Sequence, residues 1–289
     1  MNTVATPLAG RNAIVTGASR GIGKAIAIRL ASAGAHVVLA ARSVDAPTAG
    51  FTGTIHDVAE TIRAFGGTAT PIKLDVTDAA DREAFVQTCA DTVGPIDILV
   101  NNAGTSNYKH IDEYTFADLH QFIGMYYESM VHLCNLLVPG MKAKGEGWIL
   151  NLGSSSVIKL PTQPYGKHLG YFGYDAVYAS LKAGVHRFTQ GLAAELYGHN
   201  IAVNLVAPVG AVYTPGLDSM GLDFDPSHPA VEIEEQIAEA ALALVSQPPQ
   251  EVTATIAWSY KYLDGIGRPT MSLDGTQVLV ERNAAAQVS

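Results

Sequence analysis

Short apolar segments alternate with helix-length amphipathic segments along most of this chain, and this alternation restricts the folds that it can adopt. The segments predicted as strands are residues 13–16, 36–41, 69–76, 96–101, 148–152, 201–206 and 253–258. Strands that are apolar throughout, with helices between them, are typical of a parallel sheet that is covered on both faces. Right-handed crossovers then predict a doubly wound α/β sheet of about seven strands, which binds ligands at the carboxyl ends of its strands.

The segments predicted as helices lie between these strands. They are residues 23–33, 58–65, 79–93, 116–144, 177–197 and 232–245. The long fourth helix is expected to stop near Pro139 and Gly140, because proline cannot continue the hydrogen bonding of a helix. The alternation runs unbroken to about residue 260. We therefore predict a single domain over residues 1–289, with a core at about 8–260 and a C-terminal tail at about 261–289.

Composition narrows the classes of function. Of the 289 residues, 48% are hydrophobic and 16% are charged, which excludes a disordered chain. The 18 Lys and Arg against 27 Asp and Glu give a formal charge of −9 and no basic patch, so no nucleic-acid partner is expected. No apolar run reaches the roughly 18 residues of a membrane helix, and no signal peptide is indicated. Cys89 and Cys134 could pair but are expected as reduced core residues, with the cytoplasm as the compartment.

A glycine-rich turn follows the first strand. The sequence from residue 16 to 23 is Thr-Gly-Ala-Ser-Arg-Gly-Ile-Gly, and it leads into a predicted helix. Glycines let the backbone turn tightly and approach a pyrophosphate, while the helix offers its N-terminal N–H groups and the positive end of its dipole. The turn alone is also compatible with an ordinary strand-to-helix connection, and its spacing, G-x-x-x-G-x-G, differs from the common G-x-G-x-x-G.

Two other motifs occur further along the chain. Asn-Asn-Ala-Gly at 101–104 follows the fourth strand, and Tyr178 and Lys182 lie four residues apart, on one face of a predicted helix. Together and in this order, TGxxxGxG, NNAG and YxxxK resemble the short-chain dehydrogenase/reductase family over about residues 8–260. The resemblance implies a Rossmann-like domain, a nicotinamide cofactor across the strand ends, and interconversion of a carbonyl and a secondary alcohol by hydride transfer.

The resemblance also implies which residues bind the cofactor. The glycine turn would bind the phosphates, and the end of the third strand would bind the adenine. The NNAG motif would border the adenosine ribose. The loop after the sixth strand and the YxxxK helix would hold the nicotinamide. In that order, the residues are Gly17, Ser19, Arg20, Gly21, Ile22 and Gly23; Asp75 and Val76; Asn101, Ala103 and Gly104; Pro208, Val212 and Thr214; and Tyr178 and Lys182. Asn102 is expected to tie neighbouring strands together instead. Thr214 comes six residues after Pro208, where the family usually has five, and this departure puts the amide contact in doubt.

The end of the second strand indicates which nicotinamide cofactor the chain would use. Family members that bind NAD usually end this strand with an acidic residue, which accepts hydrogen bonds from both ribose hydroxyls. Here Ala41 occupies that place, Arg42 follows it, and Arg20 lies in the glycine turn. Two guanidinium groups suit the 2′-phosphate of NADP. NADP(H) is therefore predicted over NAD(H), with a solvated Arg42 as the alternative.

A catalytic set of Ser154, Tyr178 and Lys182 is predicted. A tyrosine hydroxyl has a pKa near 10, and a lysine cation about 4 Å away would lower that pKa towards neutrality by favouring the phenolate, so that Tyr178 could exchange protons near pH 7. The resemblance implies that Tyr178 exchanges a proton with the substrate oxygen and that Lys182 also holds the nicotinamide ribose. It further implies that Ser154, rather than Ser155 or Ser156, polarises that oxygen.

Tyr126 departs from the family pattern. Many members carry an asparagine at this place, about thirteen residues before a proline such as Pro139, where a kink holds a water that relays protons to the lysine. Two interpretations stay open: Tyr126 packs and turnover is slower, or the relay is altered and turnover is lost. The second leads to an alternative function, an NADP-binding sensor or scaffold. A third hypothesis is another reaction on the same fold, such as dehydration or epimerisation.

The spacing of the catalytic set is a second departure. Ser154 and Tyr178 are 24 residues apart, where about 13 is usual in the family, and the extra residues fall in an insertion at 157–177. Its aromatic side chains could line an apolar substrate pocket or form a subunit contact. A loop at about 209–231 corresponds to the mobile substrate lid of the family. No metal site is predicted.

The expected partners follow from these features. The substrate is predicted to be a small carbonyl compound or alcohol of apolar character, because the insertion is rich in aromatic residues. Members of the family are mostly dimers or tetramers built through long helices, and the apolar positions of 116–138 and 177–197 are compatible with such a homo-oligomer. Neither nucleic acid nor a membrane is expected as a partner.

Overall fold

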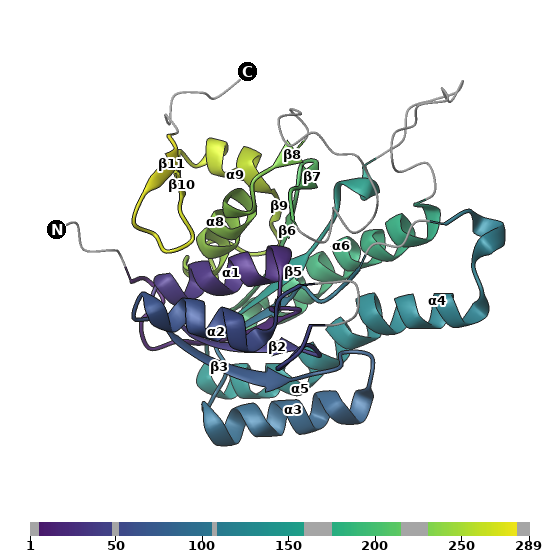
Figure 1. The fold of residues 1–289 in the computed structure, drawn as a ribbon, viewed down its shortest axis with the longest axis horizontal. Helices are drawn as coiled ribbons and strands as arrows, with labels where there is room; N and C mark the ends of the chain where they lie inside the picture. Colours follow the sequence, from purple (N-terminus) through teal and green to yellow (C-terminus); the bar gives the residue numbers. More distant parts are fainter. Residues whose placement is uncertain (1–5, 48–51, 106–108, 159–174, 215–230, 282–289) are drawn as a thin grey trace.

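Seven parallel strands form the central sheet of this protein (Figure 1). The computed structural model describes residues 6–47, 52–105, 109–158, 175–214 and 231–281. The strands are β1 (Asn12–Thr16), β2 (His36–Ala41), β3 (Thr68–Lys73), β4 (Ile98–Asn101), β5 (Gly147–Leu152), β6 (Ile201–Ala207) and β9 (Ile256–Trp258), in the order β3-β2-β1-β4-β5-β6-β9. The doubly wound sheet predicted from the sequence is confirmed. Its order reverses between β1 and β4, and ligands bind such sheets in the crevice beyond that point.

Helices cover both faces of the sheet. One layer consists of α1 (Gly21–Ser32), α2 (Ile55–Ala64) and α8 (Glu234–Val245), with α9 (Ser259–Gly265) against α8. The opposite layer consists of α3 (Ala79–Thr92), α5 (Ser129–Lys144) and α6 (Ala176–Leu196). The helix α4 (Phe116–Ile123) leads into α5, and short helical turns occur at η1 (Ile111–Glu113), η3 (Ser155–Val157) and η5 (Tyr197–His199). These two layers explain why the strands are apolar on both sides.

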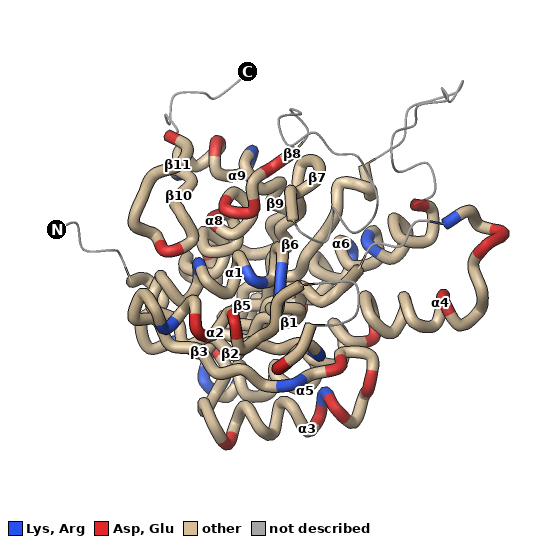
Figure 2. The backbone as a smooth tube through the Cα atoms, in the orientation of Figure 1, with Lys and Arg blue, Asp and Glu red and all other residues tan. Residues whose placement is uncertain are grey.

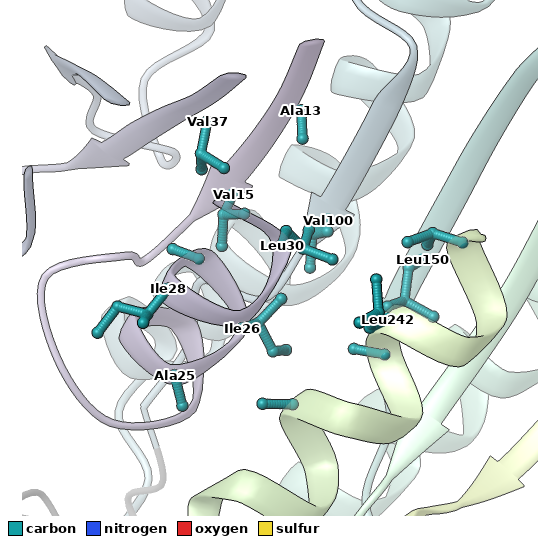
Figure 3. Packing of buried hydrophobic residues seen from close by; sticks show 14 of the residues in the cluster. Ala13, Val15, Ala25, Ile26, Ile28, Leu30, Val37, Val100, Leu150 and Leu242 are labelled. Carbon is teal, nitrogen blue, oxygen red and sulfur yellow. The ribbon is translucent and has the colours of Figure 1, made fainter. Parts of the chain in front are cut away.

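The core between α1, α8 and the sheet is built from aliphatic side chains (Figure 3). Val15 on β1 and Leu30 on α1 belong to this cluster, whereas Ile14, the neighbour of Val15, faces the opposite layer. Successive residues of a strand point to opposite faces, so one short strand contributes to both cores. Each such buried side chain stabilises the fold by about 1.5–3 kcal/mol.

The long helix continues past Pro139, and the prediction that it stops near Pro139 and Gly140 is wrong. Pro139 lies inside α5, which ends at Lys144, and Gly145 closes it in the left-handed conformation at φ 75°. Proline lacks an N–H group and leaves the carbonyl four residues earlier without its helical partner. That carbonyl belongs to Asn135, and both Asn135 and Pro139 are exposed. Water can therefore bond the freed carbonyl, and the helix tolerates the proline.

A π-helical turn separates α4 from α5. It spans η2 (Gly124–Glu128) and widens the backbone where the Ser129 hydroxyl donates a hydrogen bond to the Met125 carbonyl (2.5 Å). Turns of this kind insert one extra residue into a helix and occur frequently at functional sites. The π-turn carries Tyr126, the residue that departs from the family pattern.

The end of the chain is ordered beyond the core predicted from the sequence. Residues in the predicted tail form α9 and a hairpin of β10 (Thr270–Met271) and β11 (Val278–Val280), and a second small pair joins β7 (Ala211–Val212) and β8 (Val231–Glu232). Glu239 on α8 is 1% exposed and accepts hydrogen bonds from Arg29 Nε (2.7 Å) and Arg268 Nε (2.6 Å). One buried carboxylate thus ties α1, α8 and the C-terminal segment together.

Parts of two predicted segments lie outside the described residues: 159–174 of the insertion and 215–230 of the lid loop. That the whole chain is one domain stays a prediction. Within the described residues, no helix combines the length and the apolar character needed to cross a bilayer.

Candidate active site

The glycine turn between β1 and α1 is closely packed. Gly17 and Gly21 have positive φ angles of 67° and 52°, which non-glycine residues rarely adopt. A Cβ atom on Gly23 would lie 2.3 Å from the Gly17 carbonyl oxygen and 2.4 Å from Asn102 Nδ2. Only glycine fits there, so the turn presents bare backbone at the N-terminus of α1. Such a cradle fits the pyrophosphate of a dinucleotide.

Gly23→Ala is expected to disrupt this cradle, because the added methyl group would meet backbone atoms that cannot move aside. We expect a loss of about 1–3 kcal/mol in the free energy of unfolding together with weaker binding of the nicotinamide cofactor. Denaturant titration measures the first effect and fluorescence titration the second. Gly140→Ala is the matched control, since a Cβ on Gly140 would meet nothing within 4 Å. Equal behaviour of the two variants would contradict the packing argument.

The NNAG motif fixes the end of β4 to the glycine turn. Asn102 Nδ2 donates to the Thr16 carbonyl (2.7 Å), and the backbone N–H groups of Asn102 and Ala103 both donate to Thr16 Oγ1 (3.0 Å each). The structural role expected for Asn102 is confirmed. The motif therefore shapes the same crevice that the glycine turn borders.

The side chain of Asn101 does not point towards the predicted adenosine site. Its Nδ2 donates to Asn151 Oδ1 (2.9 Å), and Asn151 Nδ2 donates in turn to Thr189 Oγ1 (2.9 Å). These contacts connect β4, β5 and α6 beneath the strand ends. Side chains alternate along a strand, so the side chains of Asn101 and Asn102 face different neighbours.

The predicted adenosine end is rich in charge. Arg42 is half-exposed, with Nη1 3.9 Å from Asp75 Oδ2, and it lines a hollow together with Lys73 and Asp75. Burial, and then the nearby charge of Arg42, lower the pKa of Arg20. The positive charges of Arg20 and Arg42 therefore repel each other. Elsewhere Lys and Arg are scattered among Asp and Glu (Figure 2).

The loop after β6 brings the other predicted cofactor residues to the glycine turn. Val212 is buried on β7, and a Cβ on Gly21 would lie 3.4 Å from Thr214 Cγ2. The loop therefore packs against the turn after β1 although the two are far apart in the sequence. The segments predicted to bind the phosphates and the nicotinamide therefore lie side by side beyond the strand ends.

The predicted catalytic side chains meet at the carboxyl end of β5. Tyr178 is hydrogen-bonded to the side chain of Ser154, which is 8% exposed. Ser154 Oγ also accepts hydrogen bonds from the Ser156 hydroxyl (2.9 Å) and backbone N–H (3.2 Å). Lys182, one helical turn after Tyr178, is 6% exposed, and its Nζ donates to the Leu152 carbonyl (2.8 Å). The contact with Tyr178 agrees with the choice of Ser154 as the catalytic serine, which stays a prediction.

The pKa of Tyr178 is raised, and the prediction that Lys182 lowers it is wrong for this state of the protein. Burial raises the pKa most, the hydrogen bond from Ser154 offsets part of the effect, and the charge of Asp175 raises it again. Lys182 Nζ lies 5.8 Å from the Tyr178 ring centroid, and burial lowers its own pKa to about 8. Loss of water around a phenolate therefore decides the direction of the Tyr178 shift.

Tyr126 packs between the catalytic residues. Its ring stacks on Phe122 and meets the Tyr178 ring edge-on, with centroids 6.0 and 5.6 Å apart. Lys182 Nζ lies 4.7 Å from its centroid, and its hydroxyl donates to the Thr105 carbonyl. The ring therefore forms one wall of the site. This geometry agrees with the interpretation that Tyr126 packs.

Sequence reasoning missed His186, which lies one helical turn after Lys182. Its Nε2 accepts a hydrogen bond from the Ser154 backbone N–H (3.4 Å), and burial together with the charge of Lys182 lowers its pKa to about 4. A neutral imidazole at pH 7 can accept this bond and hold the serine loop. The signal was the spacing of four residues from Lys182, which places both on one face of α6. Within the described residues no cluster of metal-ligating side chains occurs.

Comparisons with known proteins identify the family to which the chain belongs. The sequence matches the short chain dehydrogenase family over residues 11–222. It is 34% identical to hydroxysteroid dehydrogenase-like protein 2 of Xenopus tropicalis, over 83% of this chain and 55% of the relative. It is 30% identical to ketoacyl reductase HetN of Nostoc sp., over 86% of this chain and 79% of the relative. The structure of L-sorbose reductase from Gluconobacter frateurii with NADPH and L-sorbose aligns with a TM-score of 0.74 at 27% identity, covering 89% of this chain and 98% of that one.

The chain belongs to the short-chain dehydrogenase family. Membership supports oxidoreductase chemistry with a nicotinamide cofactor. The chain spans about half the length of hydroxysteroid dehydrogenase-like protein 2.

Proposed function

We propose that this protein is an NADP(H)-dependent oxidoreductase that interconverts a carbonyl group and a secondary alcohol. The observation that carries the proposal is the contact between Tyr178 and Ser154 beside a buried Lys182, at the strand ends that border the glycine cradle. The bound cofactor would supply or accept the hydride. The chain itself then has to hold the substrate oxygen and exchange one proton with it.

Each of the three side chains has a distinct role in this proposal. Ser154 Oγ donates a hydrogen bond to the substrate oxygen and stabilises the negative charge that develops there. The Tyr178 hydroxyl gives its proton to that oxygen during reduction and takes it back during oxidation. Its raised pKa keeps the hydroxyl protonated at neutral pH, which is the form that reduction needs. Lys182, fixed by the Leu152 carbonyl, places a cation beside the site and would hold the nicotinamide ribose.

The sensor alternative has less support. It rests on the loss of the helix asparagine, but Tyr126 fills its place as a packed ring and leaves the contact between Tyr178 and Ser154 intact. The relatives named as reductase and dehydrogenase also favour turnover.

The preference for NADP(H) is proposed from Arg20 and Arg42. Both lie at the end of the crevice where the adenosine would bind. The strand β2 ends with Ala41 and not with an acidic residue. The structural neighbour L-sorbose reductase was solved with NADPH. Guanidinium groups match a phosphate better than a ribose hydroxyl.

Arg42→Ala is expected to weaken NADPH binding by about tenfold to a hundredfold, because a charge-assisted hydrogen bond to the 2′-phosphate is lost. NADH lacks that phosphate, so its dissociation constant should change by less than about threefold. Fluorescence titration of both cofactors measures the ratio. A similar loss for NADH and NADPH would remove the argument for NADP.

The substrate is proposed to be an apolar carbonyl compound or alcohol. The aromatic insertion suggests it, and the relatives are named for hydroxysteroids and ketoacyl compounds. A homodimer or homotetramer is proposed through α4, the π-turn η2, α5 and α6; Phe116 on α4 and Tyr127 on η2 are exposed. A cytoplasmic location is proposed because Cys89 and Cys134 are buried free thiols.

The proposal is tested by following NADPH absorbance with the purified protein over a panel of apolar ketones and aldehydes. Consumption that depends on both enzyme and ketone is the expected result. Tight NADPH binding without consumption of any member would favour the sensor alternative. No binding of either nicotinamide cofactor would overturn the proposal as a whole.

A further inference from the structure

Glu232, a buried carboxylate that the proposed chemistry does not use, lies at the base of the loop after β6. It is 2% exposed, and its Oε1 accepts hydrogen bonds from the backbone N–H groups of Val209 and Gly210 (3.0 Å to Gly210). Its Oε2 accepts a hydrogen bond from the Ser259 hydroxyl at the start of α9. Within the described residues Glu232 forms no ion pair, so neutral donors alone hold the carboxylate.

The backbone of Glu232 holds the same loop a second time. The Tyr213 N–H donates to the Glu232 carbonyl (2.9 Å), and β8 pairs with β7 through Val212 and Glu232. The N–H groups of Val209, Gly210 and Tyr213 therefore all donate hydrogen bonds to Glu232. Val209 and Gly210 are half-buried, and an N–H group without a partner is unfavourable where water has little access. The turn at 208–210 therefore depends on the Glu232 carboxylate.

The loop that Glu232 holds is the one that departs from the family spacing. The turn Pro208-Val209-Gly210 carries one residue more than the usual Pro-Gly, and the carboxylate bonds this lengthened turn directly. Thr214 follows in the same loop and packs against Gly21 of the glycine turn. The hydrogen bonds at Val209 and Gly210 therefore also help to fix the position of Thr214, which follows β7 in the same loop.

We infer that Glu232 is a positioning residue for the nicotinamide half of the cofactor site, where it fixes the loop at 208–214 so that Thr214 faces the glycine turn. The inference rests on the proposed function. The adenosine end of the site lies on the other side of β1, at Arg42 and Asp75. We expect Glu232 to have no role there. Loss of Glu232 should therefore affect the two halves of the cofactor unequally.

Two probes separate these halves. NADPH spans the whole crevice, whereas adenosine 2′,5′-bisphosphate reaches only the adenosine end. The variants are Glu232→Ala, which removes the acceptor, and Glu232→Gln, which keeps a carbonyl oxygen for the N–H groups of Val209 and Gly210. Glu235→Gln, three residues further along the chain, is the matched control for the change in charge. Among the described residues, the Glu235 side chain makes no hydrogen bond or ion pair with the loop at 208–214. Dissociation constants come from calorimetric titration, and melting temperatures from thermal unfolding.

For Glu232→Ala we expect NADPH binding to weaken by about tenfold or more, and bisphosphate binding to stay within about twofold. Glu232→Gln should recover most of the NADPH affinity, and Glu235→Gln should match the wild type. A purely structural role would instead weaken both probes alike as the melting temperature falls. If the alanine variant does not fold, the two probes are compared with Glu232→Gln and Ser259→Ala instead. Ser259→Ala removes the hydrogen-bond donor to the second carboxylate oxygen.

Equal weakening of both probes, or no weakening of either, would overturn the inference while leaving the proposed function standing. A wild-type protein that binds neither probe would instead overturn the proposed function, and the inference with it.

Discussion

Tyr178→Phe is expected to lower the rate of NADPH-dependent carbonyl reduction by about 10²–10⁴-fold, because the substrate oxygen loses its proton donor. The phenylalanine ring keeps the edge-on contact with Tyr126 and the packing around it. NADPH affinity and the melting temperature should therefore change little. Single-turnover kinetics with saturating NADPH measure the chemical step without interference from binding.

Tyr127→Phe is the matched control for this variant. Tyr127 is the neighbour of Tyr126, it is 40% exposed, and its ring packs on Phe188 away from Tyr178. Its hydroxyl should be dispensable, with activity within about twofold of wild type. Full activity of Tyr178→Phe would rule out the proton transfer assigned to this residue. An equal loss in both variants would point to disturbed packing.

Glu239→Ala is expected to destabilise the protein by about 3–5 kcal/mol, since it leaves Arg29 and Arg268 without the buried carboxylate that both of them bond. Thermal or denaturant unfolding measures the loss. Glu146→Ala is the control: Glu146 pairs with Arg11 at 4.0 Å near the surface, and such exposed pairs contribute about 0–1 kcal/mol.

Loss of Glu239 should also loosen the C-terminal segment before the rest of the fold. The hairpin of β10 and β11 depends on Arg268, whereas α1 keeps its apolar contacts with the sheet. Hydrogen exchange should therefore speed up at 268–281 first. Unchanged stability in Glu239→Ala would mean that apolar packing alone holds this segment.

The sheet could be predicted from the sequence because its strands are buried on both faces. A strand such as β5, with six buried residues in succession, cannot be confused with a surface segment. The hairpin of β10 and β11 was not predicted, since its strands are only two and three residues long and partly exposed. Pro139 misled the prediction because the sequence does not reveal that this side of α5 faces water.

The candidate site was predictable only in part, for a similar reason. Motif spacing identified Tyr178, Lys182 and Ser154, which the structure brings together. Spacing could not give the direction of the Tyr178 pKa shift, because that direction depends on burial by Tyr126 and its neighbours. Glu232 escaped notice since its partners at 209, 210 and 259 lie more than twenty residues away.

The series of side-chain hydrogen bonds from Asn101 through Asn151 to Thr189 has a consequence for how the protein folds. It is a polar path within an otherwise apolar layer, and its bond from Asn101 to Asn151 depends on the native pairing of β4 with β5, in which these two residues are partners. A shift of β4 by one residue would turn Asn101 to the opposite face and leave buried amides unbonded, at about 1–3 kcal/mol each. Misaligned sheets are thus disfavoured, and the helix that carries Tyr178 and Lys182 is locked to the correct alignment through Thr189.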